Sequence, residues 1–207
     1  MKNNFPIDAP LCKSCTLPTS HCICQHVPPV EGNLAIWLVR HEKEMDRLSN
    51  TGHLLSLILG DRVKTSVWSR TSASAHLLKA LEDPAYAPWL VFPIDGLEEG
   101  LLQTRPFGLT PGKTPLYVVI DATWKEAKKI VRKSPYLQKL PVLSLDPTGP
   151  SAFVLRRNQR QGHLCTLEVG AALVDKSGFG GGKTILDFFD RYQGAFMAAK
   201  CGHGPVK

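Results

Sequence analysis

Short apolar runs alternate with longer segments of helical period from Leu34 to Lys200. Strands and helices that alternate in this way are typical of a mostly parallel sheet covered by helices, so the pattern predicts an α/β fold. The apolar runs predict strands at Leu34–Val39, Val63–Trp68, Trp89–Phe92, Leu116–Ile120 and Val142–Leu145. The longer segments predict helices at Thr51–Leu59, Ser72–Leu81, Trp124–Lys133, Thr166–Val174 and Thr184–Lys200.

The first thirty residues do not follow this pattern. They are polar and rich in proline, and they hold four of the six cysteines of the chain. We therefore interpret residues 1–30 as a small N-terminal appendage to an α/β domain that spans residues 31–207. A second interruption, Thr104–Thr114, is rich in proline and glycine and predicts a loop.

Composition narrows the class of protein. Of the 207 residues 43% are apolar, which exceeds the content of disordered chains, and a chain of this length can bury a core without disulfides. No apolar run approaches the roughly 18 residues of a membrane span, and the first residues lack the apolar stretch of an export signal. We expect a cytosolic protein with no membrane partner, in which cysteines are thiols or metal ligands.

The charge balance points to an anionic partner. The chain has 25 Lys and Arg against 18 Asp and Glu, a formal net charge of +7. Such an excess favours binding to nucleic acid, although many basic domains bind nothing anionic. The net charge would remain positive with a metal bound, because four thiolates and one divalent ion would change it from +7 to +5.

Four cysteines gather near the start of the chain, at Cys12, Cys15, Cys22 and Cys24. Each close pair can hold two thiolates, and the six residues between the pairs allow the two pairs to face one ion. Zinc is the expected ion, and a site of four cysteines is usually structural. The alternative is a group of unrelated free thiols. The two remaining cysteines, Cys165 and Cys201, are isolated, and we interpret them as ordinary apolar or exposed residues.

The apolar run Leu116–Ile120 is followed by Asp121 and then by a well-marked helix start. Thr123 and Glu126 have the spacing of a capping box, in which each side chain satisfies an amide of the first turn. Asp121 is then left free, and a carboxylate after a buried strand lies where open α/β sheets bind ligands. The alternative is that Asp121 itself caps the helix or turns the chain.

Asp121-Ala122-Thr123-Trp124 resembles the D-x-T-W signature of the DTW-domain family of tRNA-uridine aminocarboxypropyltransferases. The resemblance covers about residues 12–175, and it departs from the family at Glu42, where proline is expected, and at Ala122, where glycine is common. The other blocks that agree in order are the four-cysteine motif, Arg40-His41-x-x-Glu44-x-x-Arg47-x-Ser-Asn50-Thr51-Gly52, Phe92-Pro93, Ser151 with Leu155-Arg156, and Thr166-Leu167-Glu168.

This resemblance implies transfer of the 3-amino-3-carboxypropyl group from S-adenosylmethionine to N3 of a tRNA uridine, with release of methylthioadenosine. It also implies a fold similar to the SPOUT methyltransferases, including a C-terminal knot. The alternatives are an RNA methyltransferase that uses the same donor and a zinc-bearing RNA-binding module without catalysis. The residues expected to bind the donor are Pro93, Asp121, Thr123, Trp124, Arg156, Thr166 and Glu168.

Asp121 is the candidate catalytic residue, because uridine N3 carries a proton and is a poor nucleophile until that proton is lost. The carboxylate could instead hold the α-amino group of the donor or balance its sulfonium charge. Trp124 has two interpretations, stacking on a base or packing its helix on the sheet. Glu168 likewise either takes part in the site or complements the N-terminus of a helix.

Five residues are candidates for RNA contact. Arg40, Arg47 and Asn50 surround one strand-to-helix connection, where the arginines could bind phosphate and where Asn50 or Thr51 is the expected N-cap. Lys128 and Lys129 lie on the helix that follows Asp121, where a row of basic residues is either a solvated face or a track for the RNA backbone. The glycine-rich stretch from residue 178 to 184 resembles a phosphate-binding loop but has Ser177 where that motif requires glycine, so a flexible turn is the preferred interpretation.

Overall fold

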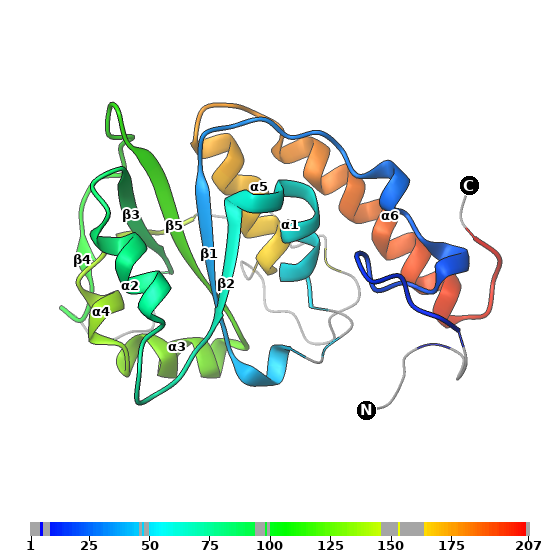
Figure 1. Ribbon diagram of the computed structural model, residues 1–207, viewed down its shortest axis with the longest axis horizontal. Coiled ribbons are helices and arrows are strands. Elements are labelled where there is room, and N and C mark those ends of the chain that lie inside the picture. Colours follow the sequence, from blue (N-terminus) through cyan, green and yellow to red (C-terminus); the bar gives the residue numbers. More distant parts are fainter. Residues whose placement is uncertain are drawn as a thin grey trace.

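Six strands form one sheet in which every pair of neighbours is parallel, in the order β2-β1-β5-β3-β6-β4 (Figure 1). The strand β5 is central in this sheet, because it lies between β1 and β3. The strands are β1 Ala35–Arg40, β2 Val63–Val67, β3 Tyr86–Val91, β4 Gln103–Thr104, β5 Thr114–Asp121 and β6 Pro141–Leu143. This computed structural model describes residues 5, 9–45, 47, 50–93, 98, 100–145, 153 and 164–205.

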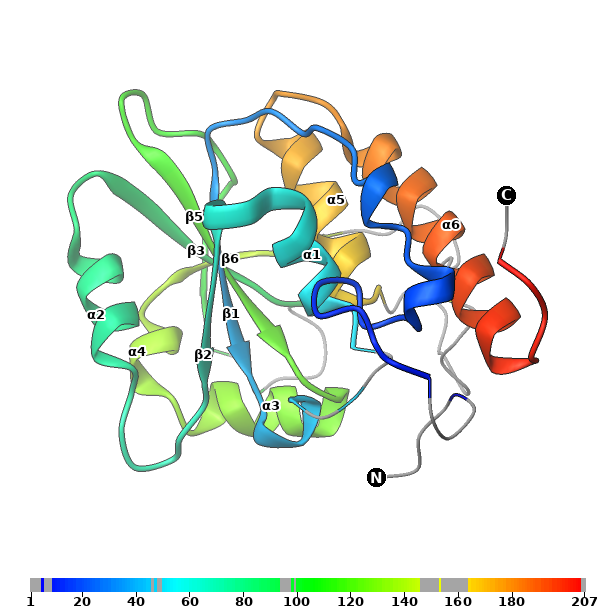
Figure 2. The same ribbon diagram turned by 45° about the vertical axis from the view of Figure 1, so that its right-hand side comes forward.

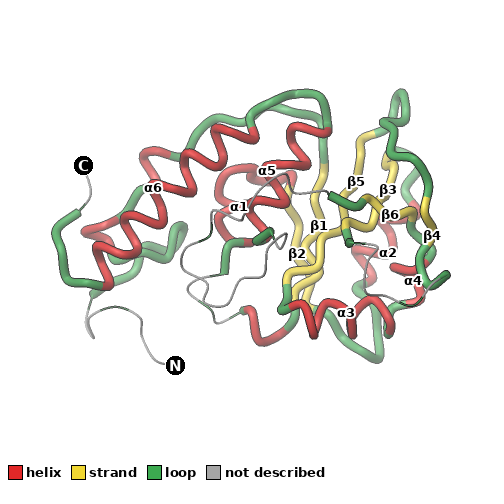
Figure 3. The backbone as a smooth tube through the Cα atoms, turned by 180° about the vertical axis from the view of Figure 1, so that it is seen from behind, coloured by secondary structure: helices red, strands yellow, loops and turns green. Residues whose placement is uncertain are grey.

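Helices cover both faces of the sheet, which confirms the predicted α/β class (Figures 1 and 3). On one face lie α1 Gly52–Leu59 and α5 Thr166–Lys176, with α6 Gly182–Lys200 packed on α5. On the other face lie α2 Ala75–Glu82, α3 Trp124–Arg132 and α4 Pro135–Gln138. Both faces are buried, which explains why the strands appear in the sequence as continuous apolar runs.

Side chains along each strand enter two separate cores. In β5, Leu116 and Val118 pack with α3 and α4, whereas Tyr117 and Val119 pack with α1 and α5. This alternation follows from the period of two along a strand. Tyr117 is fully buried, and its hydroxyl is satisfied by the hydroxyl of Ser177 at 3.0 Å.

Each predicted strand and helix is present, with some boundaries shifted. The helix expected from Ser72 begins at Ala75, because the Ser74 hydroxyl accepts a hydrogen bond from the Leu77 amide and so caps the helix there. The expected loop at 104–114 is confirmed between β4 and β5. Two short elements, β4 and α4, were not predicted, since two and four residues are too few to produce a periodic pattern.

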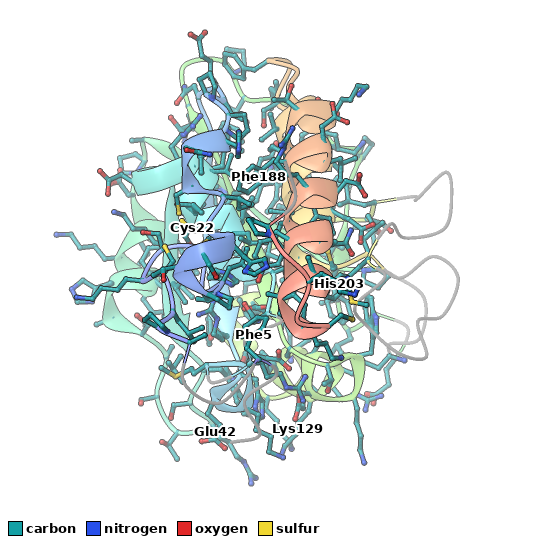
Figure 4. All side chains as sticks on the ribbon, turned by 90° about the vertical axis from the view of Figure 1, so that its right-hand side faces the viewer. Phe5, Cys22, Glu42, Lys129, Phe188 and His203 are labelled. Carbon is teal, nitrogen blue, oxygen red and sulfur yellow. The ribbon has the colours of Figure 1, made fainter. Side chains whose placement is uncertain are left out.

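The cysteine-rich N-terminal segment lies against α6, as the three views of Figures 1, 2 and 4 agree. Its apolar residues belong to the same core as α5 and α6, and the ring of Phe5 meets that of Phe196 at a centroid distance of 4.9 Å. Cys15 and Leu17 are completely buried there. A domain boundary at residue 30 and a knot near the C-terminus stay predictions. No helix among the described residues is both long enough and apolar enough to cross a membrane.

Candidate functional site

A pocket opens at the carboxyl edge of the sheet, between the first turns of α3 and α5. It encloses about 750 Å³ including its open mouth, and its wall is mainly apolar. Because α3 and α5 lie on opposite faces of the sheet, the pocket spans the edge where the strands end. Its lining residues are Val91, Phe92, Pro93, Val119, Ile120, Ala122, Trp124, Ala127, Leu145, Leu164, Cys165, Thr166 and Val169. This is the place where open α/β sheets bind ligands.

Next to the pocket, the carboxylate of Asp121 is enclosed by three side chains that donate hydrogen bonds to it. Arg40 Nε lies 2.7 Å from Oδ2, Thr166 Oγ1 lies 2.9 Å from Oδ1, and the Asn50 amide contacts both oxygens at 3.1 and 3.0 Å. Only 3% of Asp121 is exposed. We call these four residues the Asp121 cluster. The inference that Asp121 is left free is therefore wrong, since it holds four segments of the chain together.

The fold explains why these four residues meet. Arg40 and Asp121 are register partners at the carboxyl ends of two neighbouring parallel strands, so their side chains leave the sheet at the same edge. Thr166 begins α5, and Asn50 precedes α1. Of the two expected N-cap residues, Thr51 holds that position in α1, and its side chain makes no cap hydrogen bond. The side-chain oxygen of Asn50, one residue earlier, accepts a hydrogen bond from the Gly52 amide at 2.9 Å.

Gly52 permits α1 to approach this closely. A Cβ atom at residue 52 would lie 2.8 Å from Asp121 Oδ2 and 2.9 Å from Arg40 Nη2. Both distances are shorter than carbon–oxygen and carbon–nitrogen contacts allow, so any larger residue would push the ion pair apart. The glycine in the Asn50-Thr51-Gly52 block is thus explained by close packing on the Asp121 cluster.

The residues expected to bind the donor fall into two groups. Pro93, Trp124 and Thr166 line the pocket, and the ring of Trp124 also meets Phe92 edge to face at 6.1 Å. Thr123 and Glu168 instead complete capping boxes at the starts of α3 and α5. The Glu168 carboxylate accepts a hydrogen bond from the Cys165 amide at 2.7 Å, so its first-turn role is confirmed.

The residues expected to contact RNA also differ in their surroundings. Arg40 and Asn50 are both engaged with Asp121, and Arg47 forms an ion pair with the buried Glu44 at 2.7 Å. Lys129 is exposed on α3, and Lys128 is partly exposed on the same helix (Figure 4 labels Lys129). Contact of all five residues with RNA stays a prediction. Arg156, expected to bind the donor, lies outside the described residues.

The four N-terminal cysteines come together, with all four sulfur atoms within 4.8 Å of one another. Three of the Sγ separations are 3.5, 3.6 and 3.8 Å, between Cys12 and Cys22, Cys12 and Cys24, and Cys15 and Cys22. Four ligands at 2.3 Å around a tetrahedral zinc ion would be separated by about 3.8 Å. The cluster therefore has the size and the donor atoms of a metal site.

Backbone hydrogen bonds favour the thiolate form of Cys12 in this cluster. The backbone amides of Cys15 and Ser14 lower the pKa of Cys12 to about 6, because they stabilise the negative sulfur. Burial acts in the opposite direction and raises the pKa of Cys15 and Cys24 above the usual value. A bound cation would offset this cost for both residues, since metal ligation requires and stabilises the thiolate.

Sequence reasoning missed most of the pocket wall. Cys165, treated as an ordinary residue, lines the pocket beside Thr166, and burial raises the pKa of its thiol to about 12. The group is consequently neutral near pH 7 and serves as wall rather than nucleophile. Other wall residues that were not expected, such as Val91, Val119 and Ile120, belong to predicted strands. No sequence signal distinguishes a core residue from a pocket residue at the end of a strand.

The glycine-rich turn between α5 and α6 does not present a free phosphate cradle. Gly181 has a positive φ of 112°, and the Asp175 carboxylate accepts a hydrogen bond from the Gly182 amide at 2.9 Å. A carboxylate therefore already occupies the first turn of α6. The interpretation of this stretch as a turn between helices is confirmed.

Comparison with known proteins places these features in one family. The DTW domain model matches residues 9–196, which includes the cysteine cluster, the Asp121 cluster and the pocket. No solved structure matches the chain. A mouse protein and a Drosophila melanogaster protein, both named tRNA-uridine aminocarboxypropyltransferase 2, are 26% and 30% identical over 80% and 77% of this chain. The chain spans 55% and 63% of the lengths of these two relatives. On the strength of the domain match, this chain belongs to the DTW-domain family.

Proposed function

We propose that the protein transfers the 3-amino-3-carboxypropyl group of S-adenosylmethionine to N3 of a uridine in tRNA. The observation that carries the proposal is the position of the D-x-T-W motif, which contributes Ala122 and Trp124 to a pocket and Asp121 to the charged cluster beside it. The names of the relatives support the same reaction class. When bound, the donor supplies an electrophilic γ-carbon next to a positively charged sulfur.

The pocket suits the uncharged part of such a donor. Its wall offers aliphatic side chains from β3 and β5 and the aromatic face of Trp124, on which a base can stack. Thr166 connects this wall to the charged cluster, since it lines the pocket and donates a hydrogen bond to Asp121. The pocket thus orders a ligand with an apolar body whose charged end extends toward Asp121.

The reaction forms a bond from N3 to carbon, breaks the carbon–sulfur bond and releases one proton from N3. We assign Asp121 to this site, where it either accepts that proton or stabilises the positive charge of the donor. To accept a proton, the carboxylate would first have to give up one of its hydrogen bonds, for example the one from Thr166. This requirement favours the second role, which needs no change in the hydrogen bonds of the carboxylate.

We further propose that the four cysteines hold one structural zinc ion. The support is the close fit of the sulfur separations to a tetrahedral ion. The four cysteines also supply all four ligands, so the ion needs no water molecule as a ligand. Such a closed site supplies folding energy and no chemistry. Its ligands Cys12 and Cys24 are only partly buried, so a chelator can reach the ion.

A product assay tests the proposed reaction. After incubation with labelled S-adenosylmethionine and unmodified tRNA, we expect methylthioadenosine and a tRNA that carries the aminocarboxypropyl group. S-Adenosylhomocysteine would instead indicate methyl transfer, and neither product would indicate an RNA-binding module. Reactions without tRNA provide the control for spontaneous breakdown of the donor.

The basic face of α3 provides a prediction about RNA binding. Reversal of Lys128 and Lys129 to glutamate should weaken tRNA binding by more than tenfold at moderate salt, because several phosphate contacts are lost or opposed. The slope of log affinity against log salt should fall by roughly 2, and donor affinity should not change. Lys64→Glu on β2, which pairs with Asp61, is the control for a single charge reversal away from α3. Parental tRNA binding by the double variant would show that α3 is not part of the interface.

A further inference from the structure

His53 joins two parts of the site that are far apart in the sequence. It lies in the first turn of α1, directly after Gly52, and its ring is partly buried. One ring nitrogen, Nδ1, forms a hydrogen bond with the backbone carbonyl of Asn50. The other, Nε2, lies 3.2 Å from the Thr16 hydroxyl and 3.3 Å from the Cys15 carbonyl. One imidazole ring therefore contacts both the cysteine cluster and the Asp121 cluster.

The contact on the Asp121 side concerns the residue that positions the carboxylate. Asn50 donates to both oxygens of Asp121, and its side-chain oxygen holds the Gly52 amide. The backbone of Asn50 has two further contacts: its carbonyl accepts the hydrogen bond from His53, and its amide donates one to the Arg47 carbonyl at 2.9 Å. A shift of that backbone would move the amide away from Asp121, because the Asn50 side chain is short and has few rotamers.

The contact on the cysteine side concerns a turn that is costly to form. Among the residues that the structure describes, Thr16 alone has a positive φ without being glycine, and its φ is 61°. Such a conformation is unfavourable for a β-branched residue and persists only where the surroundings enforce it. Thr16 directly follows Cys15, so ligation of an ion by Cys15 would hold this turn in place. The ring of Tyr192 packs edge-on against His53 at 6.1 Å and limits the tilt of the imidazole.

We propose that His53 is a positioning residue: when the cysteine cluster holds its metal, the contacts of His53 with Cys15 and Thr16 keep Asn50 in place, and Asn50 in turn keeps Asp121 in place. The inference rests on the proposed zinc site, and its effect on turnover rests on the proposed function. On this view the metal does not only stabilise the N-terminal segment. It also keeps the Asp121 cluster assembled, through a single side chain in the first turn of α1.

Two substitutions separate the two ends of the link. The amide nitrogen of asparagine is near the place of Nδ1, so His53→Asn can keep the contact with Asn50 but cannot reach Thr16. Glutamine reaches farther, so His53→Gln can keep the contact with Thr16 and loses the one with Asn50. His76→Asn, which changes an exposed histidine of α2, is the matched control.

Amide hydrogen exchange measures the link without any need for activity. In the zinc-loaded parent, a chelator should accelerate exchange in residues 50–55 by about tenfold or more, while β5 stays protected as an internal reference. In zinc-loaded His53→Asn, residues 50–55 should already exchange at the faster rate, and the chelator should add little. His53→Gln should behave in the same way, and His76→Asn should match the parent.

Several results would overturn the inference. It fails if residues 50–55 of the parent do not respond to the chelator, or if they respond equally in His53→Asn. Should the chelator unfold the whole chain, so that β5 also exchanges, zinc-loaded Thr16→Val decides the question, because it keeps four cysteines and lacks the hydroxyl. Parental exchange of residues 50–55 in that variant would reject the link.

Kinetics provide the second measurement, and they distinguish this inference from the proposed function. If the enzyme is active, His53→Asn should lower kcat about tenfold with little change in the KM for tRNA, and full zinc content should be retained. The loss caused by chelation should be smaller in this variant than in the parent, because the two changes act through one link. If the product assay finds no activity, the exchange experiment still tests the link by itself.

Discussion

Asp121→Asn should lower both turnover and stability, by amounts that can be measured separately. Both carboxylate oxygens accept hydrogen bonds, so the amide nitrogen of asparagine must face Arg40, Asn50 or Thr166 as a second donor. Arg40, whose side chain is 16% exposed, also loses its counter-charge. Removal of one partner of a buried ion pair lowers the free energy of unfolding by about 3 kcal/mol or more. For a chain of this size, 3 kcal/mol corresponds to a fall of roughly 6–12 °C in melting temperature.

The effect of Asp121→Asn on catalysis depends on the role of the carboxylate. If Asp121 accepts the N3 proton, kcat should drop by about 10²–10⁴ with donor affinity near that of the parent. If Asp121 stabilises the donor, the loss should appear in donor affinity, measured by calorimetry. Raising the pH should partly restore only a variant that lacks a base, since solvent then deprotonates N3 unaided.

A double variant distinguishes the two effects of this substitution. Arg40→Met combined with Asp121→Asn removes both charges, so stability should recover in part while turnover stays low. Measurement of melting temperature and turnover on the same preparations checks this. A single Asp121→Asn variant that melts and turns over like the parent would show that the ion pair is neither structural nor functional.

Removal of the metal should have the second large effect. We expect one zinc ion per chain, and its removal should lower the melting temperature by more than roughly 10 °C, because ligation of a structural zinc is coupled to folding. The effect should reach α6, since Cys15, Leu17 and Ile23 are buried in the same core as that helix. Calorimetry with and without a chelator measures the shift, and elemental analysis measures the metal.

Cys15→Ser should reproduce the effect of the chelator, and Cys201→Ser should not. Cys201 is an exposed cysteine outside the cluster, so it controls for the loss of one thiol. Freshly purified protein without stoichiometric metal would contradict the zinc assignment. So would a melting temperature that the chelator leaves unchanged.

The elements of the fold were largely predictable because the sheet is buried on both faces. Strands such as β1 and β5 then consist almost entirely of apolar residues, and the helices between them carry clear caps such as Thr123 with Glu126. What could not be predicted was the order of the strands. The pairing of β5 between β1 and β3 depends on contacts between segments 81 and 28 residues apart, which no local pattern records.

The site was predictable in its residue types and less so in its contacts. The D-x-T-W motif, Arg40, Asn50 and Thr166 were all identified, but the sequence assigned them separately to catalysis, RNA contact and donor binding. In the structure they surround one carboxylate. The capping box correctly accounted for Thr123 and Glu126, yet it led to the wrong inference that Asp121 had no partner, because its partners come from three other segments.

The central place of β5 has a consequence for how the molecule is assembled during synthesis. β1 and β3 do not pair with each other, so the two halves of the sheet are joined only when residues 114–121 have left the ribosome. At that point the carboxylate of Asp121 still lacks its hydrogen bond from Thr166, which is synthesised 45 residues later. Long-range pairing of this kind is slow to form and leaves strand edges exposed in the meantime. The ligand pocket is therefore among the last features that a growing chain can complete, and a partly synthesised chain cannot offer it to a substrate.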